Sequence, residues 1–190
     1  RDESRVLRVP MPFSLNQPAT AFDCCPTDDT EWAAWTMGML LASQCAVTEK
    51  ETVAAWTALA SDATEVSGGV STIVALENLR RGLLPPISGH DNPHYFDDGA
   101  ACRGIPIGIA YAGAPEEAAR AAEIDAVVTN AEDGVWISRA IASAVSVACA
   151  GGTSREAVAS ARSALPEKSW RWSSGMASGG SCRSPSMVIT

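Results

Sequence analysis

The sequence predicts an all-α protein built as one compact multi-helix domain. Helix-start patterns of hydroxyl and acidic residues precede several apolar stretches that repeat with the period of a helix. Glycines and prolines separate these stretches, and no segment alternates apolar and polar residues as a half-buried strand does. With 190 residues, of which 46% are hydrophobic, the chain is long enough to bury a real core.

Most of the expected helices have a start signal of their own. The first begins at Asp28, which stands three residues before Glu31, and continues to about Cys45. Thr153 and Glu156 have the same spacing at the start of the last helix. Cys45 and Cys149 lie on apolar helix faces, so we expect both to be small buried side chains. Further helices are expected over about residues 48–59, 71–81, 115–128, 134–150 and 153–165, with a short or kinked one within 100–111.

Three segments have no helical pattern. Residues 1–26 are interrupted by four prolines and are expected to be irregular. Residues 85–98 form a long polar loop that carries both histidines. Residues 169–190 are rich in Ser, Gly and Arg, so we expect this tail to be disordered or to come from a frameshift. The helical domain is therefore expected over residues 27–168.

The charge and the apolar pattern argue against several classes of partner. A net charge of −8 and a pI near 4.7 argue against nucleic acid and against an anionic membrane surface. The longest apolar run, residues 135–150, contains Arg139 and is too short to span a bilayer. No apolar stretch follows a basic N-terminal start, so we expect a soluble, cytoplasmic protein. The sequence does not indicate its oligomeric state.

The stretch with the most chemical content is Thr27-Asp28-Asp29-Thr30. Two carboxylates and two hydroxyls stand within four residues, and all are hard oxygen ligands of the kind that Mg²⁺ and Mn²⁺ prefer. A helix start needs only one capping oxygen, so the additional donors favour a metal site. The alternative is an acidic helix cap on the surface, which the helix dipole stabilises.

Two further stretches follow this one in a recognisable order. Residues 98–108 read Asp-Gly-Ala-Ala-Cys-Arg-Gly-Ile-Pro-Ile-Gly, and the helical stretch 122–132 ends in Thr129-Asn130. Together the three resemble the ADP-ribosylglycohydrolase family, in the branch related to the dinitrogenase-reductase-activating enzyme, across about residues 24–165. In that family the first motif binds metal, the second lines the substrate pocket, and the third usually ends in Thr-His.

The resemblance implies the helical fold of that family around a dinuclear Mg²⁺ or Mn²⁺ centre. It also implies hydrolysis of an N- or O-glycosidic bond to ADP-ribose or to a related ribosyl group. The positions that match the family's metal motif are Thr27, Asp28 and Asp29. The positions expected at the substrate pocket are His94, Asp98, Gly99, Ala100 and Ala101. No residue is assigned as catalytic, and the aglycone is not indicated.

Several alternatives stay open. This chain has no counterpart of the family's opening Gly-Asp-Ala-x-Gly segment or of its second Asp-containing metal motif. An incomplete member, a non-catalytic relative that binds a nucleotide or ribosyl ligand, and a structural protein are therefore alternatives. His90 and His94 have a spacing seen in zinc sites, to which Cys24-Cys25 would add thiolates. Arg103 is expected to be an ion-pair partner rather than a phosphate clamp.

Overall fold

The structure is all-α in the part of the chain that it describes, as the sequence predicts. The computed structural model describes residues 27–62, 66, 68–167 and 169. Its helices are α1 (Asp28–Ala42), α2 (Glu49–Asp62), α3 (Val70–Arg80), α4 (Ile87–His90), α5 (Ala101–Ala110), α6 (Pro115–Ala126), α7 (Asp133–Cys149) and α8 (Ser154–Ser163). No strand occurs among these residues, and none of their helices is both long and apolar enough to cross a membrane.

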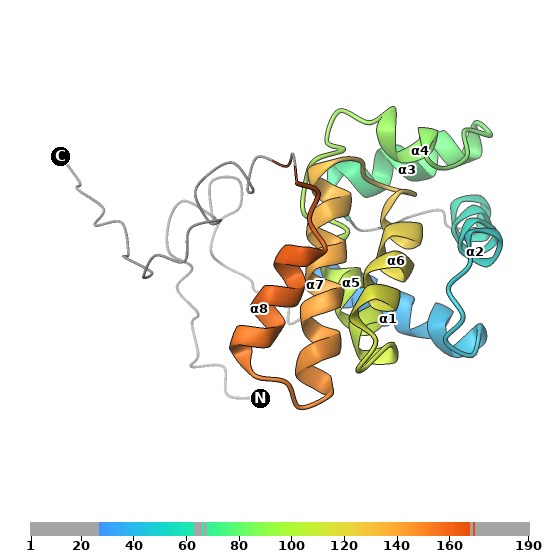
Figure 1. The fold of residues 1–190 in the computed structure, drawn as a ribbon. Coiled ribbons are helices and arrows are strands. Elements are labelled where there is room, and N and C mark those ends of the chain that lie inside the picture. The colour runs from blue at the N-terminus through green and yellow to red at the C-terminus, as the bar shows by residue number, and fades with distance from the viewer. Residues whose placement is uncertain (1–26, 63–65, 67, 168, 170–190) are drawn as a thin grey trace, which may run out of the picture.

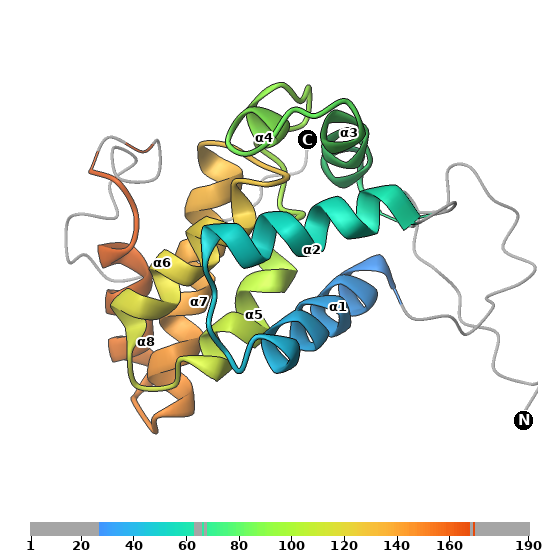
Figure 2. The same ribbon diagram turned by 90° about the vertical axis from the view of Figure 1, so that its right-hand side faces the viewer.

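The central helix of the domain is α7. It packs against α5, α6 and α8, while α1 packs against α5, and α2 packs against α3 and α6. Figure 1 shows α8 at one edge of the domain and α2 at the opposite edge, with α5, α6 and α7 between them. In the view of Figure 2, α2 lies along α1, and α3 and α4 lie together at one end of the bundle. Since α5 contacts both α1 and α7, its first residues lie inside the domain.

Two glycines allow α5 to pack closely on α7. A Cβ atom at Gly104 would lie 2.8 Å from the Ser138 carbonyl oxygen, and one at Gly108 would lie 2.6 Å from the Ala142 carbonyl oxygen. Only a residue without a side chain fits at these two positions. The sequence predicts a short or kinked helix here, and α5 is ten residues long with Pro106 inside it. Its glycines have a packing role.

The core consists of clusters rich in tryptophan and alanine. In the first cluster the rings of Trp32 and Trp56 stack, with centroids 5.3 Å apart and planes 12° apart. This aromatic contact joins α1 to α2. The second cluster is built on α1, α5, α6 and α7, where alanines allow the helices to approach one another. Its members are Leu40, Ile107, Ala118, Ala121, Ala122 and Ala142.

Local capping explains where the first and last helices begin. Thr27 caps α1, because its Oγ1 accepts a hydrogen bond from Thr30 N at 3.3 Å. Asp28 is therefore the first helical residue and not the cap that its spacing predicts. At the start of α8, Thr153 and Glu156 form the predicted capping box.

The two cysteines expected to be buried are exposed. α1 ends at Ala42, and Cys45 lies in the following turn with φ 64°, where its N–H donates to the Leu40 carbonyl at 2.7 Å. This left-handed conformation ends the helix earlier than the apolar pattern predicts. Cys149 is the last residue of α7 and lies three residues after Ser146, the last buried position of that helix. The prediction of buried side chains at both cysteines is therefore wrong.

The segment over residues 85–98 is anchored to the core and contains α4. The buried Ser88 hydroxyl donates a hydrogen bond of 2.8 Å to a backbone carbonyl of the segment that follows α6. The buried Asn92 amide donates to the Ser71 carbonyl at 2.7 Å and to the Thr129 carbonyl at 3.1 Å. Because buried polar groups with satisfied hydrogen bonds fix a backbone, this segment is a structured wall next to the start of α5.

Residues 1–26 and residues 170–190 lie outside the described part of the chain, so the irregular and disordered segments expected there stay predictions. Ser169, which belongs to the predicted tail, is described and is 2% exposed.

Candidate functional site

The predicted metal ligands stand at the start of α1. Asp28 is half-buried and Asp29 is exposed. Neither carboxylate accepts a hydrogen bond or forms an ion pair with another described residue. The Thr27 hydroxyl supplies the cap and also lies 3.1 Å from Thr30 Oγ1. The dipole of α1 stabilises negative charge at this end, but the cap itself does not need the two carboxylates.

The second predicted stretch forms a tight turn that leads into α5. Asp97 Oδ1 accepts a hydrogen bond from Gly99 N at 3.0 Å. A Cβ atom at Gly99 would lie 2.9 Å from Ser71 Oγ, so the start of α3 packs directly against the turn. Ala100 is fully buried in the core, and Ala101 is half-buried. The small residues at positions 99 and 100 therefore have packing roles in this structure.

Cys102, in the second predicted stretch, interacts with residues of both stretches. Its thiol donates a hydrogen bond to the Gly99 carbonyl at 3.4 Å. Burial raises the pKa of the Cys102 thiol, the positive charge of Arg103 opposes this, and the negative charge of Asp29 raises the pKa further. Asp29 at the start of α1 therefore lies within electrostatic range of the turn, consistent with the packing of α1 on α5.

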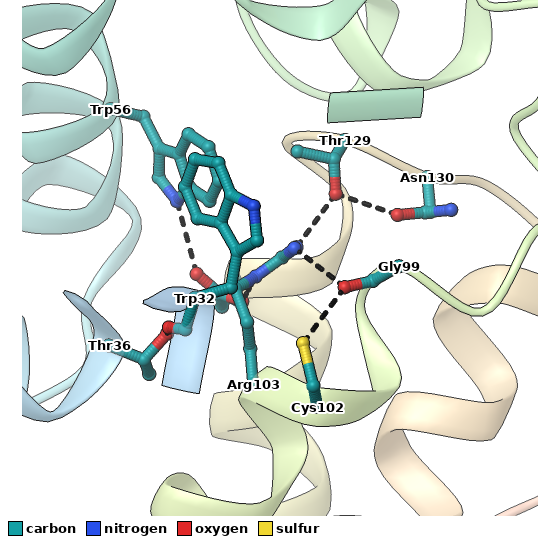
Figure 3. Close-up of polar contacts among 9 residues, drawn as sticks. Trp32, Thr36, Trp56, Gly99, Cys102, Arg103, Thr129 and Asn130 are labelled. Atoms are coloured by element: carbon teal, nitrogen blue, oxygen red, sulfur yellow. Dashed lines mark hydrogen bonds and ion pairs between the residues drawn. The ribbon is translucent and has the colours of Figure 1, made fainter. Parts of the chain in front are cut away.

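Arg103 is the centre of a buried polar network (Figure 3). Its side chain is 0% exposed, and its Nε lies 2.7 Å from Asp125 Oδ2 in an ion pair. Its Nη1 donates to the Gly99 carbonyl at 3.0 Å, and its Nη2 donates to Thr129 Oγ1 at 2.7 Å. Trp56 Nε1 donates to the second oxygen of Asp125 at 3.1 Å, and the guanidinium lies 5.0 Å from the centre of the Trp56 ring. The prediction that Arg103 is an ion-pair partner is confirmed.

The network continues from Thr129 to the turn before α5. Because Thr129 Oγ1 accepts a hydrogen bond from Arg103 Nη2, its own hydroxyl hydrogen is free to donate to Asn130 Oδ1 at 2.7 Å. The Asn130 amide nitrogen then faces Asp97 Oδ1 at 2.9 Å and the carbonyls of Tyr95 and Asp97, both at 3.2 Å. A single direction of hydrogen bonding therefore runs from the buried arginine to the carboxylate of Asp97.

His94 and Asp98, the other predicted substrate contacts, are exposed. The ring centroids of His94 and Phe96 are 6.1 Å apart. Asp98 lines a cavity of about 300 Å³ together with Asp97 and Phe96. Within the described ranges, no residue of α1 lines this cavity. The structure thus packs α1, which carries Asp29, on α5, and it places Asp98 at a hollow beside the turn that leads into α5.

The described residues contain no group of three or more His, Cys, Asp or Glu side chains arranged to hold a metal ion. This applies to His90 and His94, the residues of the zinc alternative, whereas Cys24 and Cys25 lie outside the described part of the chain. For Mg²⁺ or Mn²⁺, the predicted ligands described at the start of α1 are the two carboxylates and the Thr27 hydroxyl, and Thr30 and Glu31 are further oxygen donors in the same turn.

Asp125 is the important residue that sequence reasoning does not single out. The signal was available, because Asp125 follows Ala118, Ala121 and Ala122 on the face of α6 that is buried. A carboxylate on the buried face of a helix needs a buried cationic or hydrogen-bonding partner. Its partner, Arg103, is 22 residues away in sequence and lies on a different helix, so the pair itself could not be assigned.

Comparison with known proteins agrees with the resemblance found in the sequence. The family model described as ADP-ribosylglycohydrolase matches residues 4–184. No curated protein and no solved structure matches the chain. The match covers nearly all of the 190 residues and includes the α1 start, the turn before α5 and the Thr129-Asn130 segment. This chain therefore belongs to the ADP-ribosylglycohydrolase family.

Proposed function

We propose that this glycohydrolase uses a divalent metal ion at the start of α1 to cleave an N- or O-glycosidic bond to ADP-ribose or to a related ribosyl group. One observation carries the proposal: α1, whose first turn carries Asp28 and Asp29, packs on α5, the helix into which the Asp98-Gly99 turn leads. The thiol of Cys102 contacts the Gly99 carbonyl. Two motifs that are 70 residues apart in sequence (Asp29 and Gly99) are therefore carried by, or lead into, helices that pack together.

The donor set at the start of α1 fits Mg²⁺ or Mn²⁺. Thr27, Asp28 and Asp29 offer only oxygen atoms, and both carboxylates are without a partner among the described residues. In proteins Mg²⁺ is usually held by one or two carboxylates, by waters and by substrate phosphates. ADP-ribose carries two phosphates, whose oxygens would be further ligands of this kind. When bound, the metal ion supplies Lewis acidity for substrate oxygens and for a water.

The residues around the turn hold its shape while substrate binds. Each guanidinium nitrogen of Arg103 has a partner, in Asp125, the Gly99 carbonyl or Thr129, and the side chain is 0% exposed, so Arg103 positions the turn and does not bind phosphate. The raised pKa of Cys102 keeps its thiol protonated at neutral pH. Cys102 therefore acts as a hydrogen-bond donor to Gly99 and not as a nucleophile or a metal-binding thiolate.

Release of free ADP-ribose from ADP-ribosylated peptides tests the proposal. Arginine-linked and serine-linked peptides are compared with Mg²⁺, with Mn²⁺ and with a chelator. We expect metal-dependent release, and we expect Asp28→Asn with Asp29→Asn to lower it by about 100-fold or more, the scale of several kcal/mol of transition-state stabilisation. Asp62→Asn, at the exposed end of α2, is the matched control and should retain full activity.

Two outcomes would count against the proposal in different ways. Hydrolysis that survives both the chelator and the double variant would remove the metal from the mechanism. Binding of ADP-ribose without hydrolysis, under all metal conditions, would favour the non-catalytic relative that the sequence leaves open.

A further inference from the structure

A groove of about 450 Å³ lies between α2, α6 and the Pro85-Pro86 segment, and it has no part in the proposed hydrolysis. Its apolar walls are formed by Val53 on α2, by Ile124 on α6, by Val127 directly after α6 and by the two prolines. In Figure 1, α2 lies next to α6, and α4 lies above both. Among the described residues that line the groove, none belongs to α1 or to the turn before α5. We call it the α2–α6 groove.

The α2–α6 groove carries a negative charge that has no partner in the described part of the chain. Glu49, in the first turn of α2, lines the groove and forms neither a hydrogen bond nor an ion pair with another described residue through its carboxylate. On the α6 wall, Arg120 is paired with Glu117 at 3.0 Å. Glu123 on the same wall is paired with Arg139 at 3.4 Å. A complementary surface would therefore be apolar and would bring a cation to Glu49.

The segment beside the groove has these two properties. Leu84 and Ile87 flank the two prolines and are 49% and 55% exposed, so the segment presents large apolar side chains to solvent. Arg81, three residues before Leu84, is exposed and forms no ion pair with a described carboxylate, although its Nη1 lies 3.5 Å from Asn78 Oδ1. We call residues 81–87 the rim of the groove. Large apolar groups exposed together beside an unpaired charge are typical of a surface that a partner covers.

The groove and its rim complement each other but are parts of one face. Pro85 and Pro86 line the groove and also belong to the rim, so the two are adjacent. Within one chain, Arg81 and Glu49 do not pair among the described contacts. A twofold axis presents the same patch of both chains to each other, so the rim of each chain can enter the groove of the other. Both unpaired charges then gain a partner, and they do so twice in each dimer.

We propose that this face joins two copies of the chain in a symmetric dimer. The rim leucine, Leu84, packs into the α2–α6 groove of the second copy, and Arg81 pairs with Glu49 of the partner subunit. A second copy is favoured over a different protein because this chain itself displays the apolar and basic groups that match the groove. The proposal does not rest on the proposed hydrolysis, whose residues lie outside the groove and the rim.

Analytical ultracentrifugation of the full chain tests the proposal over about 1–500 µM, the range of weak self-association. The average mass should rise with concentration from 19.8 kDa, the mass of one chain, toward twice that value. Arg81→Glu and Glu49→Arg should each raise the dissociation constant by about tenfold or more, because each dimer then contains two contacts between like charges. An equimolar mixture of the two variants should dimerise again, since each supplies the charge that the other has lost.

Two control variants separate this face from general effects of charge and apolar surface. Arg155→Glu, on α8 at the opposite edge of the domain from α2, changes the net charge as much as Arg81→Glu does and should leave the dissociation constant unchanged. Leu84→Asp should weaken association by about tenfold or more. Leu41→Asp, at a leucine of α1 that is 76% exposed, should not weaken it. Circular dichroism confirms that each variant is folded.

The proposal is overturned if the chain stays a monomer over the whole concentration range. It is also overturned if each charge variant dimerises as readily alone as the unsubstituted chain does, or if their mixture does not associate. Association that survives Leu84→Asp but not Leu41→Asp would place the contact on another face and would overturn it as well. None of these outcomes affects the test of hydrolysis, because no variant used here alters the start of α1 or the turn before α5.

Discussion

The carboxylates of Asp125 and Asp29 both act on groups at the start of α5, and their surroundings are opposite. Asp125 is fully buried, 2.7 Å from Arg103 Nε and 3.1 Å from Trp56 Nε1. Asp29 is exposed, has no hydrogen-bond partner among the described residues, and acts on Cys102 through its charge alone. The first carboxylate is committed to the fold. The carboxylate of Asp29 is available to a ligand. The two thus illustrate the difference between polar residues that support the structure of the site and polar residues that would bind a ligand there.

The buried charge of Arg103 is tolerated because each of its guanidinium nitrogens has a hydrogen-bond partner. Arg103 donates hydrogen bonds to a carboxylate, a carbonyl and a hydroxyl, and this hydroxyl in turn donates a hydrogen bond to Asn130. A partly satisfied network of this kind would cost more than an apolar core. The contrast with Asp29 therefore predicts different consequences for the loss of each carboxylate, which the following variants measure.

The largest effect is expected from Asp125→Ala. The variant leaves the guanidinium of Arg103 buried without its counter-charge, and losing one partner of a buried pair costs about 3–5 kcal/mol. Urea denaturation measures the loss in the free energy of unfolding. Arg103→Met combined with Asp125→Leu should be more stable than Asp125→Ala, since no charge remains buried. A cost near zero for the single variant would show that the pair does not support the fold.

The next effect is expected at Gly134, the second residue of α7. A Cβ atom there would lie 2.6 Å from the Tyr95 carbonyl oxygen, 2.7 Å from Asn130 Nδ2 and 2.8 Å from the Asp97 carbonyl oxygen. Gly134→Ala should therefore displace the end of the network and cost about 1–3 kcal/mol. Thermal unfolding measures this loss.

Gly38 in α1 is the matched control, because a Cβ atom there would meet nothing within 4 Å. Gly38→Ala should stabilise the protein by about 0.5–1 kcal/mol, through the lower helix propensity of glycine. If both substitutions had the same sign, the close approach of α7 to the turn would be in doubt.

The same comparison explains how much of the molecule could be predicted. The capping box of Thr153 and Glu156 lies within four residues, so its residue types determine the structure. The all-α class follows from the same kind of local pattern. The ion pair of Arg103 with Asp125 depends on how α5 packs on α6. No local sequence pattern predicts this packing. Cys45 shows the reverse error, since two left-handed turn residues, Gln44 and Cys45, override an apolar helical pattern.

Within the site, the residues at the start of α1 and at Gly99 could be singled out from the sequence by their type. Their roles could not be assigned in this way. The resemblance predicts that Ala100 lies at the substrate pocket, which stays a prediction, and the structure shows that Ala100 is fully buried. A small residue satisfies close packing and close ligand approach equally well, so a sequence does not distinguish them. Gly99 illustrates this, because Ser71 Oγ occupies the space that a side chain would need.

A smaller effect on stability is expected from Asp28→Asn with Asp29→Asn. Each carboxylate contributes only its interaction with the dipole of α1, so the free energy of unfolding should change by about 1 kcal/mol or less. Added Mn²⁺ should raise the thermal midpoint of the unsubstituted chain, since a ligand that binds only the folded state stabilises it. The double variant should show no such rise. An equal rise in both proteins would place the metal elsewhere.

The smallest effect is expected from Glu156→Gln, and it sharpens the comparison among exposed carboxylates. Unlike Asp29, Glu156 has local partners: its Oε2 accepts hydrogen bonds from Thr153 N at 2.7 Å and from Thr153 Oγ1 at 2.8 Å. These hydrogen bonds lower the pKa of Glu156 in the folded state. A lowered pKa stabilises the fold above the unfolded-state pKa of about 4.3, and this contribution disappears as the pH falls through the folded-state pKa.

Glu156→Gln keeps the shape of the capping box and removes its charge, so it isolates this contribution. At pH 7 the variant should unfold less than about 2 °C below the unsubstituted chain, and the two midpoints should converge as the pH falls from about 5 to 3. Calorimetric scans across this range measure the difference. If it stayed constant with pH, the effect would come from the amide's weaker hydrogen bonding and not from charge. The capping box would then stabilise α8 as a neutral cap does. By the same reasoning, the charges of Asp28 and Asp29 would stabilise the fold only when a ligand such as the proposed metal ion is bound.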